Sequence, residues 1–105
     1  MFSNNKNIIT PNEICTAFVE VVFISMGEFV FKITLDKFIE YKKYMPVFMY
    51  KDAKYECLSS SHESQSSKME FICIGPASVL KDKKSYIAEI NKTKKNYIIK
   101  LSLVK

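Results

Sequence analysis

The chain has 105 residues and is 48% hydrophobic, with eight Phe and six Tyr, which predicts one globular domain over residues 1–105 and excludes a disordered chain. The net charge of +5 comes from sixteen lysines without a single arginine, which disfavours base readout by the bidentate arginine fork. No apolar run approaches the roughly 20 residues of a membrane helix, and no signal-peptide pattern begins the chain, so we expect a cytoplasmic protein.

The first predicted element is a helix over residues 11–26. Thr10, Pro11 and Glu13 in "TPNE" combine a capping box with a proline at the first helical position. Gly27 is placed to end this helix. The β-branched run "VEVVFI" makes a strand the alternative.

The remaining segments predict mainly strands. Residues 28–35, "EFVFKITL", alternate between apolar and polar side chains, and Asp36 can cap a short second helix over residues 37–45 that Pro46 ends. "KYECLSS" and "KMEFICIG" predict two strands joined by a serine-rich loop, and "SYIAEIN" and "NYIIKLSLV" predict a hairpin joined by "KTKK". We therefore expect an α+β fold, with a mostly antiparallel sheet of four to five strands, the N-terminal helix packed on one face and a short second helix.

Positive charge is concentrated near the C-terminus. Residues 81–105 hold eight lysines and two acids, a net charge of +6, so residues 1–80 carry a net charge of −1. The lysines form two clusters on either side of the strand predicted over residues 85–91, which would separate them by more than about 20 Å. The clustered lysines, which a nucleic-acid-binding protein would use, are Lys81, Lys83, Lys84, Lys92, Lys94 and Lys95.

A second candidate surface for nucleic acid lies in "FIEYKKYMPVFMYKDAKY", where tyrosines alternate with lysines. Single-stranded nucleic acid binds such surfaces by base stacking over a cationic groove. Because several of these rings must also cover the core, packing in the core and at its rim is the favoured interpretation.

The acidic side chains suggest a protein partner. Glu13 and Glu20 are seven residues apart, which on a helix places them on one face about 10 Å from each other. Together with Glu63 in the serine-rich loop they would suit a basic cleft on another protein. His62 is the only histidine and stands beside Glu63, but members of a catalytic triad converge from separate elements, so we expect no enzyme.

The three cysteines, Cys15, Cys57 and Cys73, show no Cys-x-x-Cys spacing. They predict buried reduced thiols and neither a disulfide framework nor a zinc site. With only two glycines and no phosphate-binding loop, the sequence predicts no cofactor and no metal.

A small α+β domain with these acidic features resembles the immunity proteins that bacteria keep beside polymorphic toxins, including those of contact-dependent growth inhibition. The resemblance rests on size, element order and Glu13, Glu20, Glu56 and Glu63. It implies a non-enzymatic protein-binding module that blocks a cognate toxin domain, often a nuclease, although the positive net charge departs from the acidic balance of many nuclease inhibitors. The expected partner contacts are Glu13, Glu20, Glu56, His62 and Glu63.

Two alternatives remain open. One is a basic nucleic-acid-binding accessory protein that uses the lysine clusters. The other is a structural subunit of a phage or secretion assembly. No membrane contact is expected, and the sequence leaves the oligomeric state undetermined.

Overall fold

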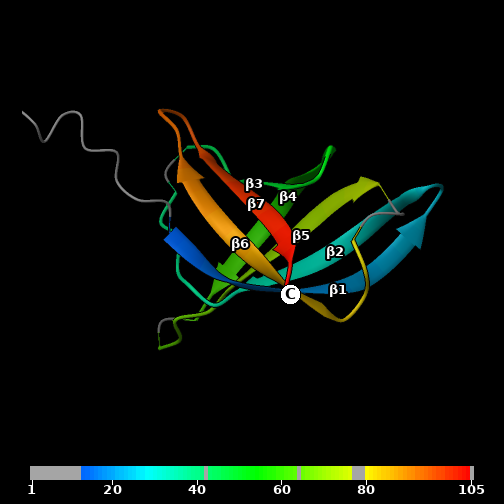
Figure 1. Ribbon diagram of the computed structural model, residues 1–105, viewed down its shortest axis with the longest axis horizontal. Coiled ribbons are helices and arrows are strands. Elements are labelled where there is room, and N and C mark those ends of the chain that lie inside the picture. Colours follow the sequence, from blue (N-terminus) through cyan, green and yellow to red (C-terminus); the bar gives the residue numbers. More distant parts are fainter. Residues whose placement is uncertain (1–12, 42, 64, 77–79, 105) are drawn as a thin grey trace, which may run out of the picture.

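The computed structural model describes residues 13–41, 43–63, 65–76 and 80–104 (Figure 1). In this part of the chain seven strands form a closed barrel with the order β1-β2-β5-β4-β3-β7-β6. The strands are β1 (Glu13–Ser25), β2 (Glu28–Leu35), β3 (Val47–Tyr50), β4 (Ala53–His62), β5 (Met69–Pro76), β6 (Lys84–Lys92) and β7 (Tyr97–Leu103). Neighbouring strands run antiparallel except β3 and β7, which are parallel and close the barrel. The expected α+β fold is therefore wrong, because the described residues are all-β.

The predicted N-terminal helix is instead strand β1. It pairs with β2 on one side and with β6 on the other, and its alternate side chains Ala17 and Val19 are fully buried. A helix cap contributes only about 1 kcal/mol, whereas pairing with β6 from Glu13 to Val19 and with β2 from Ala17 to Ser25 supplies backbone partners along the whole length of the strand. The capping residue Thr10, and residues 11 and 12, lie outside the described residues.

The predicted second helix is also wrong, since the described residues between β2 and β3 contain none. In the barrel order, β5 and β4 separate β2 from β3, so this connection has to cross two strands. The connection is instead held by contacts with distant strands, since the Glu40 carbonyl oxygen accepts the Tyr97 hydroxyl of β7 and the Tyr41 hydroxyl contacts Ser60 on β4. The connection is anchored by the buried Ile39 and Pro46.

Other strands agree with the sequence prediction. The alternating segment 28–35 is strand β2, and the predicted C-terminal hairpin is formed by β6 and β7. The serine-rich segment does join two paired strands, although β4 continues into it as far as His62. Gly27 ends no helix but occupies a two-residue turn with Met26, and the φ angles of Met26 and Gly27 are 46° and 85°.

The barrel interior is filled by large side chains, as expected for a small barrel. Three aromatic pairs with edge-on geometry and ring centroids 5.3 Å apart lie in the core, namely Phe31–Tyr55, Phe48–Phe71 and Tyr50–Tyr86. No polar or charged residue is buried among the described residues. The β6–β7 turn lies on the left of the barrel in Figure 1 and the β1–β2 turn lies on the right.

Candidate functional site

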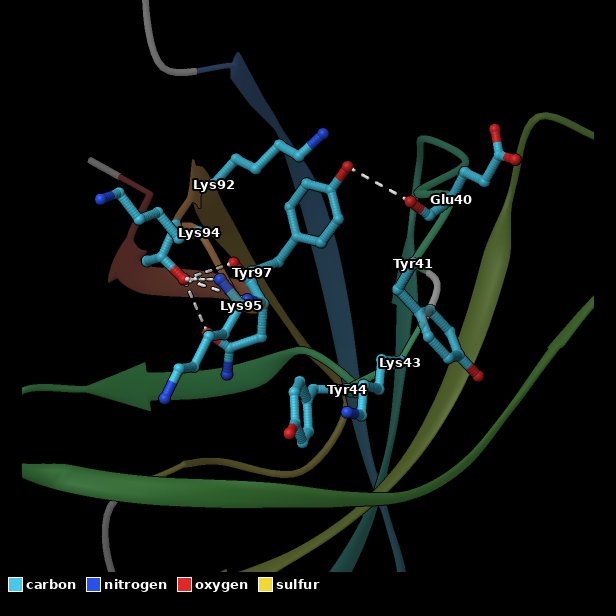
Figure 2. Close-up of a pocket in the computed structure, with 10 residues that line it drawn as sticks. Glu40, Tyr41, Lys43, Tyr44, Lys92, Lys94, Lys95 and Tyr97 are labelled. Atoms are coloured by element: carbon cyan, nitrogen blue, oxygen red, sulfur yellow. Dashed lines mark hydrogen bonds between the residues drawn. The ribbon is translucent and has the colours of Figure 1, made fainter.

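A pocket of about 510 Å³ opens at the end of the barrel where β6 turns into β7 (Figure 2). Two segments that are far apart in the sequence form it, the β2–β3 connection and the β6–β7 turn. We call it the aromatic–lysine pocket. Its lining residues are Glu40, Tyr41, Lys43, Tyr44, Lys92, Thr93, Lys94, Lys95, Asn96 and Tyr97. Four lysines against one glutamate make this opening strongly positive.

Thr93 holds the β6–β7 turn in shape. Its backbone N–H donates to the Asn96 carbonyl oxygen at 2.7 Å, and its Oγ1 accepts the backbone N–H of Asn96 at 3.0 Å. The N–H of Lys95 points to the same Oγ1 at 3.3 Å. These bonds keep the polar backbone groups inside the turn, and the side chains of Lys94 and Lys95 are exposed at the pocket.

Two tyrosine hydroxyls attach the β2–β3 connection to the barrel. Tyr97, the first residue of β7, donates its hydroxyl to the Glu40 carbonyl oxygen at 3.3 Å (Figure 2). The Tyr41 hydroxyl lies 2.6 Å from Ser60 Oγ on β4, and the half-buried Tyr41 ring packs against the core. The two halves of the pocket are thus joined by direct contacts.

In the pocket, a lysine ammonium group lies near each of two tyrosine rings. Lys92 Nζ lies 5.8 Å from the centroid of the Tyr97 ring, and Lys43 Nζ lies 5.5 Å from that of Tyr44. Both distances are within the range of cation–π attraction. The Tyr44 side chain is 46% exposed. A ligand that combines negative charge with a flat ring could therefore contact an ammonium group and a ring face together.

The structure brings together only one of the two lysine clusters. Lys92, Lys94 and Lys95 line the pocket. The other lysines, Lys81, Lys83 and Lys84, are exposed near the start of β6. Eight residue steps separate the first and last lysine of β6, about 26 Å at strand spacing, which agrees with the separation predicted from the sequence.

The acidic residues of β1 are not gathered on one face. Successive side chains of a strand alternate, so Glu13 and Glu20, seven residues apart, point to opposite faces and not to the common face expected of a helix. Glu13 forms an ion pair with Lys37. Glu20 lies 3.4 Å from Lys32 Nζ. These lysines reduce the negative potential that a basic partner would meet.

The remaining predicted partner contacts lie on β4 and just beyond it. Glu56 is exposed with its carboxylate 4.0 Å from Lys54 Nζ. The His62 ring packs on Phe38 with centroids 4.2 Å apart, and its Nε2 lies 2.6 Å from the Ser66 carbonyl oxygen. Glu63 accepts the Ser66 N–H through its backbone carbonyl.

One residue of each group contacts the β2–β3 connection, since Glu13 on β1 pairs with Lys37 and His62 on β4 packs on the next residue, Phe38. Two strands separate β4 from β1 on one side of the barrel and three on the other. Glu13 and His62 therefore both lie beside the start of the β2–β3 connection, whereas Glu20 points to the other face of β1.

The sequence interpretation missed Tyr97 as a site residue. Its only local signal is its position directly after the lysine cluster "KTKKN". The prediction that the tyrosines of this segment pack in the core or at its rim is correct for Tyr41, Tyr50 and Tyr55, which are buried or packed against the core. The same interpretation is incomplete for Tyr44, which is exposed at the pocket.

A second notable surface is the projecting end of the β1–β2 hairpin. The pairing of β1 with β6 ends at Val19, and β1 continues for six more residues paired with β2. Four large apolar side chains are more than half exposed there, Val22 at 57%, Phe23 and Ile24 at 59% and Met26 at 99%. We call these four residues the apolar tip.

The described residues contain no group of three or more His, Cys, Asp or Glu side chains that could hold a metal ion. No helix in the same part of the chain is long and apolar enough to cross a membrane. Comparison of this chain with models of known protein families, with curated proteins and with solved structures finds no match.

Proposed function

We propose that this protein binds single-stranded nucleic acid at the aromatic–lysine pocket, as a non-enzymatic accessory protein. The observation that carries the proposal is the convergence of Tyr44 and Tyr97, each with its own lysine, around one opening. Bases stack on aromatic rings and phosphates pair with ammonium groups, and single-stranded nucleic acid supplies both kinds of group at every nucleotide.

The chemistry of the pocket favours a single strand over a duplex. In a duplex the base faces are stacked on each other, so the tyrosine rings would have no partner. Lysine acts as a point charge and does not fork onto base edges. We therefore expect binding that tolerates many sequences and weakens as salt rises.

The proposal can be tested by fluorescence anisotropy with a labelled oligothymidylate of about 12 nucleotides, within the site size of small barrels that bind single strands. If four phosphates contact the four pocket lysines, a plot of log Kd against the logarithm of the salt concentration should have a slope of about 2.8. The double variant Lys94→Glu/Lys95→Glu should reduce this salt dependence by about half, and it should weaken binding strongly.

A matched control has the same change of charge at the other end of β6. The variant Lys81→Glu/Lys84→Glu alters two exposed lysines outside the pocket, so its affinity should stay much closer to that of the wild type. Equal losses in both double variants would mean that net charge and not the pocket causes binding. Preference for a duplex of the same length would also contradict the proposal.

A second candidate function is protein binding, and the apolar tip is the observation that favours it. Clusters of exposed apolar side chains on soluble proteins often mark protein interaction sites. The immunity-protein hypothesis stays a prediction of this kind. A toxin bound through the apolar tip would be lost with Phe23→Ser, would be retained with Lys94→Glu/Lys95→Glu, and would arrest growth when produced alone.

A further inference from the structure

Cys57 and Cys73 face each other across the β4–β5 pair. They are direct partners in the strand register, and their sulfur atoms lie 3.2 Å apart. Both are free thiols. Cys73 is fully buried and Cys57 is half-buried. Two thiols held this close differ from isolated buried cysteines, because they can form a bond with each other.

We propose that Cys57 and Cys73 form a reversible dithiol–disulfide site that is oxidised by low-molecular-weight disulfides. The proposal is independent of nucleic-acid binding, since neither cysteine lines the aromatic–lysine pocket.

Strand geometry permits the bond. Directly opposed residues of antiparallel strands have Cα atoms about 4.5–5.5 Å apart, which lies within the range of about 4.4–6.8 Å that disulfides span. The sulfurs need only approach from 3.2 Å to a bond length of about 2.05 Å. The register shift between Cys57 and Ser59 adds a point at which β4 can adjust.

The exchange has a defined order. The Cys57 thiolate, on the more accessible residue, attacks one sulfur of the small disulfide RSSR, forms a mixed disulfide and releases RS⁻. The Cys73 thiol then transfers its proton to the released RS⁻, and its sulfur attacks Cys57 Sγ, which forms the Cys57–Cys73 bond and releases a second RS⁻. The two thiol protons end on the two RS⁻ groups, so one RSSR is reduced to two RSH while the protein loses two hydrogens.

The environment of Cys73 agrees with this order. Its hydrogen bond to the Cys57 sulfur and its burial raise the pKa of the Cys73 thiol, so it remains protonated and is a poor first nucleophile. Cys15 lies on another strand, where burial and the Asp36 carboxylate raise the pKa of its thiol. Cys15 therefore serves as an internal reference that should not be oxidised with the pair.

The bond would staple β4 to β5 around the serine-rich loop. The linked residues are 16 apart in the sequence. Closing such a loop limits the unfolded chain and should raise the urea concentration at the midpoint of unfolding. This shift should disappear after reduction with a dithiol.

The test incubates the folded full-length protein with glutathione disulfide, quenches it with acid, and alkylates it after unfolding for mass spectrometry. We expect a loss of two hydrogens, one alkylated cysteine at Cys15, and a peptide pair linked through Cys57 and Cys73. Cys15→Ser should form the same link, and Cys57→Ser should form none.

Three outcomes would overturn the proposal. One is a persistent mixed disulfide at Cys57 with Cys73 still alkylated. Another is a link that includes Cys15. The third is alkylation of all three cysteines under conditions that oxidise a reference dithiol. Because the wild-type protein is sufficient for these measurements, the test does not depend on the folding of a variant.

Discussion

The ring of Tyr55 lies against the backbone of Gly75 in the neighbouring strand, where no side chain has room. A Cβ atom at Gly75 would come within 2.3 Å of the ring Cδ2 atom. The Tyr55 hydroxyl donates to the carbonyl oxygen of the next residue, Pro76, at 3.1 Å. Glycine at this position therefore lets β5 approach one of the largest rings of the core.

Replacing Gly75 with alanine should destabilise the barrel. We expect Gly75→Ala to lower the free energy of unfolding by about 1–3 kcal/mol, as for other overpacked cores, measured by urea denaturation. In a Tyr55→Leu background the added cost of Gly75→Ala should fall, because the clashing ring is absent. An equal cost in both backgrounds would show that the ring is not the cause.

Base stacking predicts a specific effect of Tyr44, whose ring is exposed in the aromatic–lysine pocket. Tyr44→Ala should weaken binding of the oligothymidylate by about 5- to 150-fold, corresponding to about 1–3 kcal/mol per stacked base. Tyr44→Phe keeps the ring face and should retain most of the affinity. If both variants lost affinity equally in the anisotropy measurement, stacking on this ring would be excluded.

Alkaline pH should destabilise the protein through two core tyrosines. Burial raises the pKa of Tyr55 and of Tyr86 above the ordinary value near 10. The folded state thus holds these protons more tightly than the unfolded state, so their stabilising effect is complete below about pH 10. This stabilisation is lost as the pH rises through the pKa values that the two tyrosines have in the folded state. Urea midpoints measured across this range should fall together with the appearance of tyrosinate absorbance.

Tyr86→Phe provides the control for this pH dependence. The variant cannot ionise at this position, so its stability should fall less steeply above about pH 10 than that of the wild type. At neutral pH it should be less stable by about 1 kcal/mol, because the Tyr86 hydroxyl accepts the Lys81 N–H at 2.9 Å. An unchanged alkaline slope would contradict the assignment to Tyr86.

The β1–β2 turn predicts a stabilising substitution. Met26 has a φ of 46° and is 99% exposed, so it adopts a left-handed conformation without a packing role. Asparagine followed by glycine is the preferred sequence for a two-residue turn with positive φ at both positions. Met26→Asn should raise the free energy of unfolding by about 1 kcal/mol, whereas Met26→Ala should bring no such gain. Equal stabilities of the two variants in urea would contradict this explanation.

The candidate site could be predicted only in part. Lys92, Lys94 and Lys95 were identifiable from the sequence because a cluster of lysines beside a strand is a local pattern. Their meeting with Tyr44 was not, because the tyrosine belongs to a segment about fifty residues earlier. The helix expected for residues 11–26 failed because a capping box reports only on the end of an element, not on what pairs along it.

The sequence by itself determined β2, the β6–β7 hairpin and the separation of the two lysine clusters. These features follow from an alternation of period two and from turns between adjacent segments, which act over a few residues. Only the tertiary structure decided that β1 is a strand and that the two halves of the aromatic–lysine pocket meet. Both depend on closing the barrel, in which β3 pairs in parallel with β7 and Val47 lies opposite Ile98. No local pattern encodes a pairing between residues so far apart, since its stability comes from backbone hydrogen bonds and a core that form only when the whole barrel is assembled.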